Sequence, residues 1–154
     1  MTSAAAAATI NLAIAHTIWY SYEYISLWGT NGIASYLTSG SMISSYTITF
    51  FVTKATRNAI RTQQIFPLHW HLKSQTLIDQ LPTQTAHRAF ILGIVGAFMS
   101  GLTIYLLDYK NIMSLYFYEY VAFSMVYFIL LASAMAVMAA YRAMGDDVLK
   151  QVKF

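Results

Sequence analysis

Two stretches of this chain contain no charged residue and are each long enough to cross a lipid bilayer. They run over residues 89–107 and 120–140. A helix needs about 20 mostly apolar residues to span the hydrocarbon core. A third uncharged stretch, residues 33–53, is rich in Ser and Thr, and a fourth apolar stretch covers residues 4–27. The pattern predicts an all-α integral membrane helical bundle, with four transmembrane helices arranged as two hairpins.

Composition supports the same fold class. Only 10% of the 154 residues are charged and 58% are hydrophobic, whereas soluble domains carry about 25% charged residues. The length suits a single membrane domain, residues 1–154, with no room for a second, soluble domain. There is no cysteine, which excludes disulfides and thiolate metal sites.

The basic residues predict the orientation of the bundle. Of the nine Lys and Arg residues, all but Lys110 follow the second or the fourth predicted span. Basic residues concentrate on the cytoplasmic side of membrane proteins. We therefore expect both termini in the cytoplasm of a bacterial-type cytoplasmic membrane, and a cytoplasmic loop over residues 54–88. If residues 1–28 lie along the outer surface instead, the chain has three spans and an outer N-terminus.

Two features refine the loop and the N-terminus. Within the loop, Pro67 and Pro82 bracket a segment with leucines at helical spacing, which predicts a short interfacial helix. The N-terminal alanine run is preceded by no basic residue, so it reads as a retained helix and not as a signal peptide.

Small and hydroxylated residues repeat at helical spacing along three of the predicted spans. Such residues let membrane helices approach closely. On the third and fourth spans they predict a tight hairpin, formed by Gly93, Ala97, Gly101, Ala132, Ala136 and Ala140. On the second span we expect a buried helix interface, with a hydrated pore as the alternative, formed by Ser41, Ser45, Thr49 and Thr53.

The pattern Tyr-x-Tyr-Glu-Tyr occurs twice, near the end of the first span and at the start of the fourth. In the four-span topology both copies lie near the outer face. An ionisable group near the membrane is a functional candidate, and tyrosine faces attract cations. Ligand or ion binding, or hydration at the headgroup boundary, would explain this set: Glu23, Glu119, Tyr20, Tyr22, Tyr24, Tyr116, Tyr118 and Tyr120.

The histidines do not form a recognisable metal or haem site. His16 lies within the first span, where one structural hydrogen bond explains it better than a haem, because no second histidine lies at matching depth. His69 and His71 diverge by about 200° on a helix, and no cysteine or carboxylate cluster completes a metal site. We expect no catalytic residue, no metal and no cofactor.

The sequence favours one function class over two others. Small size, packing ridges, abundant aromatics and missing catalytic motifs predict a non-catalytic accessory or scaffold subunit, with membrane lipid and other membrane subunits or copies of itself as partners. The alternative is a small oligomeric channel or transporter, with a Ser/Thr-lined path and outer glutamates that select cations. A haem-carrying redox subunit ranks third. Neither an enzyme nor a nucleic-acid partner is expected.

Overall fold

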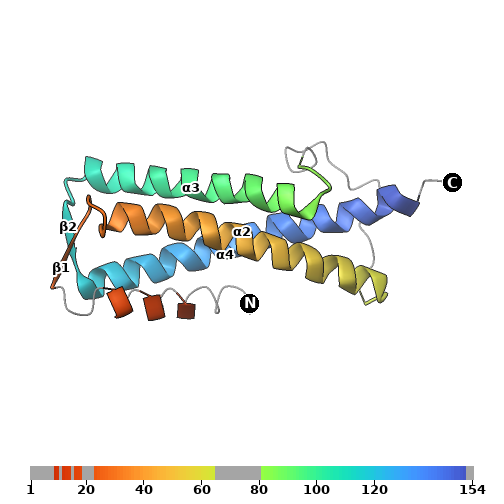
Figure 1. The fold of residues 1–154 in the computed structure, drawn as a ribbon, viewed down its shortest axis with the longest axis horizontal. Coiled ribbons are helices and arrows are strands. Elements are labelled where there is room, and N and C mark those ends of the chain that lie inside the picture. The colour runs from red at the N-terminus through yellow and green to blue at the C-terminus, as the bar shows by residue number, and fades with distance from the viewer. Residues whose placement is uncertain (1–8, 11, 15, 19–22, 65–80, 152–154) are drawn as a thin grey trace.

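The computed structural model describes the chain except residues 1–8, 11, 15, 19–22, 65–80 and 152–154 (Figure 1). For residues 146–151 it describes the helix and not the side chains. The described residues form three long helices, α2 (Ile33–Arg61), α3 (Thr85–Tyr109) and α4 (Phe117–Gln151). Two short strands, β1 (Tyr24–Ser26) and β2 (Ser114–Tyr116), pair at one end of these helices. We call this the strand end of the bundle.

The described residues before β1 are helical at 9–10, 12–14 and 16–18. They run alongside the long helices and not across their ends (Figure 1). Ile10 and Ile14 line an apolar cavity of about 280 Å³ together with α2 side chains and Phe128 of α4. The N-terminal segment is therefore a fourth helical layer on the bundle.

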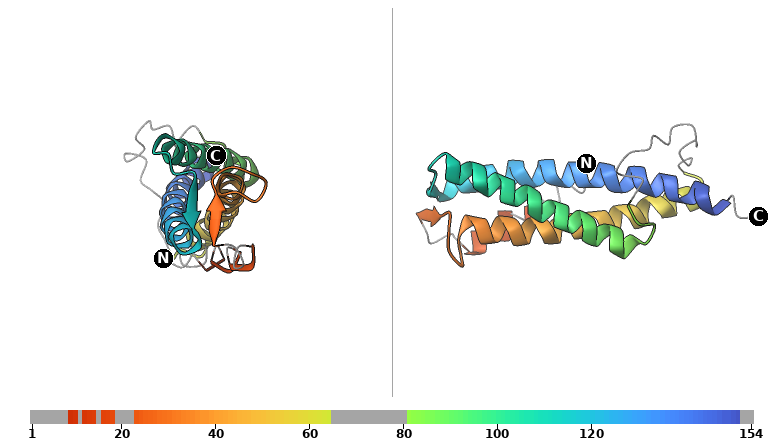
Figure 2. Two further views of the ribbon diagram at one scale, coloured as in Figure 1. Left: turned by 90° about the vertical axis from the view of Figure 1, so that its left-hand side faces the viewer. Right: turned by 90° about the horizontal axis from the view of Figure 1, so that it is seen from above.

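Helix α2 packs against both α3 and α4, and the end-on view in Figure 2 shows the three long helices arranged as a triangle. Its fully buried residues recur every fourth position, at Ile33, Leu37, Ser41, Ser45, Thr49 and Thr53. Residues spaced by four form one of the ridges through which helices interlock. The buried face of α2 is thus apolar near the strand end and hydroxylated along the rest of its length.

Helices α3 and α4 are long and apolar enough to cross a membrane. Their most apolar windows reach mean hydropathies of 2.1 and 2.2, and only 28% of each window is buried inside the protein. Much of the remaining surface is apolar, with Phe98, Leu130 and Val137 each about two-thirds exposed (66%, 66% and 69%). Large exposed apolar surfaces suit lipid or another protein and not water. This supports association with a membrane.

The long helices extend beyond the expected bounds, although α2 begins at Ile33 as predicted. The second, third and fourth predicted spans all continue as helix past the expected ends, and α2 reaches Arg61 where the sequence suggested residue 53. The first segment was expected to be helical to residue 27, but Tyr24–Ser26 form a strand. The expected interfacial helix between Pro67 and Pro82 falls mainly on residues 65–80, outside the described residues.

The sequence predicted that small residues pack α3 against α4, but the glycines of α3 that make close contacts pack against α2. On α3, Gly93 and Gly96 approach α2, where added Cβ atoms would meet the carbonyl oxygens of Met42 and Ser41 at 3.3 and 2.8 Å. Gly101 faces open space, with nothing within 4 Å, and Ala97 is only partly buried. On α4 the fully buried alanines are Ala132, Ala139 and Ala143, whereas Ala136 and Ala140 are partly buried. Gly93 and Gly96 thus allow α3 to approach α2 closely.

Candidate functional site

The two strands bring the Tyr–Glu repeats together at the strand end. They are antiparallel, with Tyr24 opposite Tyr116, Ile25 opposite Leu115 and Ser26 opposite Ser114. Backbone bonds extend the pairing on both sides, from the Leu27 N–H to the Met113 carbonyl at 2.8 Å and from the Phe117 N–H to the Glu23 carbonyl at 3.2 Å. The last tyrosine of one repeat therefore faces the first tyrosine of the other.

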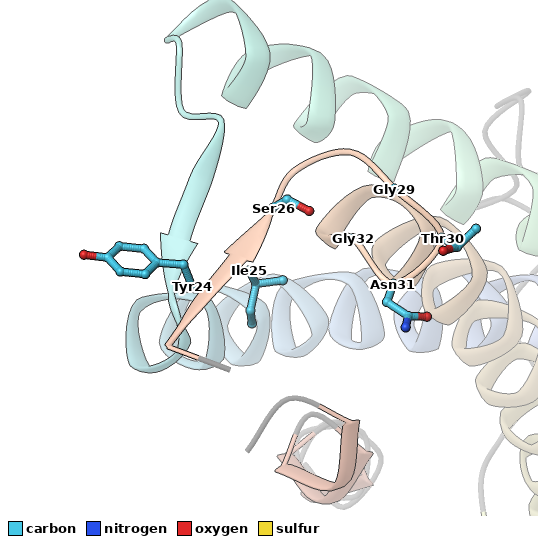
Figure 3. Close-up of a pocket in the computed structure, with 7 residues that line it drawn as sticks. All are labelled: Tyr24, Ile25, Ser26, Gly29, Thr30, Asn31 and Gly32. Atoms are coloured by element: carbon cyan, nitrogen blue, oxygen red, sulfur yellow. The ribbon is translucent and has the colours of Figure 1, made fainter. Parts of the chain in front are cut away.

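Tyr24 and Tyr116 form a close aromatic pair on the outer face of the strands. The Tyr24 hydroxyl donates to the Tyr116 hydroxyl at 2.6 Å, and the ring centroids are 4.3 Å apart. This hydrogen bond, followed by loss of hydration and the charge of Glu119, raises the pKa of Tyr24 above its ordinary value. Ile25 points the other way, toward α4, and is buried (Figure 3). Alternation along the strand thus separates an aromatic outer face from an apolar inner face.

Glu23 and Glu119 are both exposed. Glu119 lies in the first turn of α4, and its Oε2 accepts a hydrogen bond from the Tyr116 N–H at 3.3 Å. A carboxylate here satisfies an unpaired amide and offsets the positive end of the helix dipole. The geometry assigns Glu119 a capping role. Because both carboxylates are exposed, neither Glu23 nor Glu119 lies in a desolvated cation site.

The remaining repeat tyrosines divide between surface and core. Tyr118 is 83% exposed, whereas Tyr120 is fully buried. Tyr120 packs edge-on against Tyr36 of α2, with centroids 6.2 Å apart, and Tyr36 also contacts Phe128 in the same way. Tyr20 and Tyr22 lie outside the described residues. The last tyrosines of the two repeats thus have different surroundings, because Tyr24 is exposed and Tyr120 is buried.

The turn between β1 and α2 depends on glycine. Gly29 has φ +127°, a conformation that side chains disfavour, and an added Cβ at Gly32 would meet the Leu27 carbonyl oxygen at 2.9 Å. The Ser35 hydroxyl donates to the Thr30 and Gly32 carbonyls at 3.0 and 2.9 Å. The turn and β1 enclose a shallow cavity of about 230 Å³ (Figure 3). These contacts fix the position of the neighbouring Trp28.

Trp28 and Asp108 join the turn to α3 and border a larger groove. The Trp28 indole N–H donates to the Asp108 Oδ1 at 3.3 Å. Between α2 and α3, a groove of about 540 Å³ is lined by Trp28, Gly29, Ala34, Ser35, Thr38, Gly101, Ile104, Tyr105 and Asp108. The sequence alone singled out neither Trp28 nor Asp108 as a site residue. The only sequence signal was an acidic residue directly after an uncharged span.

Four hydroxyl side chains of α2, which we call the hydroxyl stripe, lie inside the bundle. Ser41, Ser45, Thr49 and Thr53 are all fully buried. Ser41 Oγ shares a hydrogen bond with the Tyr127 hydroxyl of α4 at 2.9 Å, and Ser45 faces Gly96 of α3 so closely that no Cβ fits between them. Among the described residues, the Ser45, Thr49 and Thr53 hydroxyls have no hydrogen-bond partner. At Ser41 and Ser45 the stripe forms a helix interface and not an open channel.

Three arginines, one from each long helix, converge at the end of the bundle opposite the strands. Arg88 Nε and Nη2 donate to the Pro82 carbonyl at 3.1 and 3.0 Å, and those of Arg142 donate to the Leu81 carbonyl at the same two distances. Arg57 donates to the Thr83 carbonyl and to Thr85 Oγ1. Arg88 is fully buried and Arg142 is 7% exposed. We call these three residues the arginine clamp; sequence reasoning took them only as orientation markers.

His16 is exposed, as are the other described residues of the N-terminal helical segment. Within the part of the chain that the structure describes, no group of three or more potential metal-ligating side chains comes together. His69 and His71 lie outside that part.

The chain was compared with protein-family models, with curated proteins and with solved structures. None of the three comparisons gave a match.

Proposed function

We propose that this chain is a non-catalytic membrane scaffold or accessory subunit, with four spans and both termini in the cytoplasm. Two apolar helices, α3 and α4, support membrane insertion. The described N-terminal residues run along the bundle, as a span would, and line a cavity against α2 and α4. The arginine clamp lies at one end of the bundle and the aromatic strand end at the other, which agrees with a cytoplasmic basic side and an outer aromatic belt.

The observation that carries the scaffold proposal is the closed contact between the α2 hydroxyl stripe and α3. An added Cβ at Gly96 would lie 2.8 Å from the Ser41 carbonyl oxygen, and Ser45 fills the remaining space. A hydrated path needs room for water beside its polar groups. The hydroxyl side chains of α2 at Ser41 and Ser45 therefore serve helix packing within one copy of the chain. At these two positions no space remains for a hydrated path.

The partner surface we propose is the aromatic face of the strand end. Tyr118, Tyr109 and Trp28 are 83%, 71% and 57% exposed. Tyrosine and tryptophan are enriched in protein interfaces and dominate binding energies there. Tyr109 ends α3, Tyr118 lies in the first turn of α4, and Trp28 lies in the glycine turn. Ordered backbone thus holds all three side chains, which lowers the entropy cost of docking. Another membrane subunit, or a second copy of the chain, would cover this face.

The test is native mass spectrometry of the full chain extracted in mild detergent from its own membrane. A hetero-complex or a homo-oligomer of fixed stoichiometry is expected. A photo-crosslinking residue at position 118 should then capture protein, whereas the matched control at Val137, on the apolar side of α4, should capture mainly lipid. A stable monomer whose position 118 captures no protein in the native membrane would contradict the proposal.

A small oligomeric channel is the second candidate. One observation favours it: within the described residues, the buried hydroxyls of Ser45, Thr49 and Thr53 have no hydrogen-bond partner. A path along them would require α2 to separate from α3. Flux of protons, Na⁺, K⁺ or organic cations through liposomes, lowered by Thr49→Val, would favour this candidate over a scaffold.

A further inference from the structure

The groove between α2 and α3 combines two exposed aromatic side chains with one carboxylate. Tyr105 is 65% exposed and Trp28 is 57% exposed. Gly101, Tyr105 and Asp108 follow one another at helical spacing, so one face of α3 carries an open position, an aromatic ring and an acid in sequence. Its volume of about 540 Å³ lies within the usual range of small-molecule sites, roughly 300–1,000 Å³.

We propose that this groove binds an organic ammonium group. An ammonium ion is attracted to the faces of Trp and Tyr and to a carboxylate, and aromatic cages use these forces to bind choline-like ligands. Asp108 supplies the charge and Trp28 and Tyr105 supply the rings. Thr38 and Ser35 add hydroxyls on the α2 side of the groove. The proposal does not rest on the scaffold role, because the groove lies within one copy of the chain.

The Trp28–Asp108 hydrogen bond prepares the site. It fixes one carboxylate oxygen, Oδ1, against the indole at 3.3 Å and holds the ring beside the acid. Within the described residues, no ion pair to Asp108 is found, and the neighbouring Lys110 is exposed. The carboxylate therefore keeps its capacity to accept a cation, and the indole lies directly beside it.

Gly101 leaves the floor of the groove open. A Cβ at this position would meet nothing within 4 Å. A glycine in a helix interior costs about 1 kcal/mol relative to alanine, and at Gly101, unlike Gly96, no close helix approach explains it. A side chain larger than methyl would fill the space where the ligand would lie.

Two sources could supply the ammonium group. One is the choline headgroup of a phosphatidylcholine-type lipid that reaches the groove from the bilayer, and the other is a free quaternary ammonium ion in solution. The test uses a chain in which Trp28 is the only tryptophan, through Trp19→Phe and Trp70→Phe. In maltoside detergent its fluorescence is titrated with tetramethylammonium and with choline, against NaCl at equal ionic strength. Nanodiscs of phosphatidylcholine and of phosphatidylglycerol with the same acyl chains supply the lipid arm, with retained lipid counted by native mass spectrometry.

The expected result is a saturable response that NaCl does not produce, or selective retention of phosphatidylcholine. Response to the free ions identifies a soluble ligand, and retention of lipid alone identifies the headgroup. Asp108→Asn and Gly101→Leu should each weaken the binding at least tenfold. Glu119→Gln removes another carboxylate at the same end and should bind as the parent does, as should Gly101→Ala, which leaves the groove largely open.

Two results would overturn the proposal. One is the absence of both a saturable response to the ions and a preference for phosphatidylcholine. The other is binding that survives unchanged in both Asp108→Asn and Gly101→Leu. Far-ultraviolet circular dichroism shows that each variant is folded before binding is scored, and the two variants act independently, one through charge and one through volume.

Discussion

Two glycines on α3 have opposite surroundings and should respond in opposite ways to the same change. Gly96→Ala would place a Cβ 2.8 Å from the Ser41 carbonyl oxygen and against Ser45. The backbone oxygen cannot rotate away, so α2 and α3 must separate. Overpacking of this kind costs about 1–3 kcal/mol, which exceeds the helix-propensity gain of up to about 1 kcal/mol. The thermal unfolding midpoint in detergent should fall.

Gly101→Ala is the matched control for that variant. The same helix gains the same propensity, but its Cβ meets nothing within 4 Å. Its unfolding midpoint should stay the same or rise slightly. Equal midpoints for the two alanine variants would contradict the close α2–α3 contact.

Arg88 should be important for stability because it is fully buried and bonded twice to one carbonyl. Arg88→Met keeps most of the side-chain volume but leaves the Pro82 carbonyl without these donors. Pro82 is partly buried, so the loss should lie at or below the cost of about 1–3 kcal/mol for an unsatisfied buried acceptor. Arg61→Met, at the exposed end of α2, should cost less than about 1 kcal/mol. Thermal unfolding of the two variants by circular dichroism checks the difference, and equal losses would show that the clamp does not stabilise the bundle.

At the scale of elements, the strand pair should be weakened by high pH. The pKa of Tyr24 is raised, first by its hydrogen bond to Tyr116. A raised pKa in the folded state means that the stabilisation is fully present below the unfolded value of about 10 and is lost as the pH rises through the folded value. Tyrosinate absorbance near 295 nm should therefore show a late-titrating group in the parent chain that Tyr24→Phe removes. Identical titration curves would contradict the pairing.

The sequence could predict the long helices because their signal is local. An uncharged run of about 20 residues, such as 89–107, identifies an apolar helix without knowledge of its neighbours. The spacing of Ser41, Ser45, Thr49 and Thr53 likewise predicted one face of α2, and that face is buried. The partner of each face could not be predicted in this way. Small residues on α3 indicated close packing, but only the three-dimensional arrangement shows that Gly93 and Gly96 face α2 and not α4.

The candidate site was less predictable because its contacts join distant residues. Tyr24 and Tyr116 are separated by 92 positions, and Trp28 and Asp108 by 80. The repeat contains both Tyr24 and Tyr116, which are in contact. A strand of three residues is too short to show a period, however, and the sequence of Tyr24–Ser26 is typical of the end of a span. The sequence shows which residue types are present but not which of them contact one another in the fold. The groove and the arginine clamp depend wholly on such pairings.

At the scale of the whole molecule, the two ends of the bundle differ in chemistry. In the described residues, every acidic side chain with a described position, Glu23, Asp108 and Glu119, lies at or near the strand end, whereas Arg57, Arg88 and Arg142 lie at the other end. Between these ends, the buried face of α2 is apolar at Ile33 and Leu37, near the strands, and hydroxylated from Ser41 to Thr53. This asymmetry would fix one orientation in a membrane, because cytoplasmic loops are enriched in Lys and Arg while Asp and Glu contribute little.

The orientation can be tested directly because the chain contains no cysteine. Single cysteines introduced at Thr30 and Lys110, both exposed near the strand end, should react from outside with a membrane-impermeant maleimide. A cysteine at Gln64, just after α2, should react only once the membrane is opened. Thr2→Cys then decides between the two topologies: protection from outside supports four spans, because the N-terminus must then share the side of Gln64. Labelling of position 2 from outside, with Gln64→Cys still protected, would mean that the first segment does not cross and that the chain has three spans.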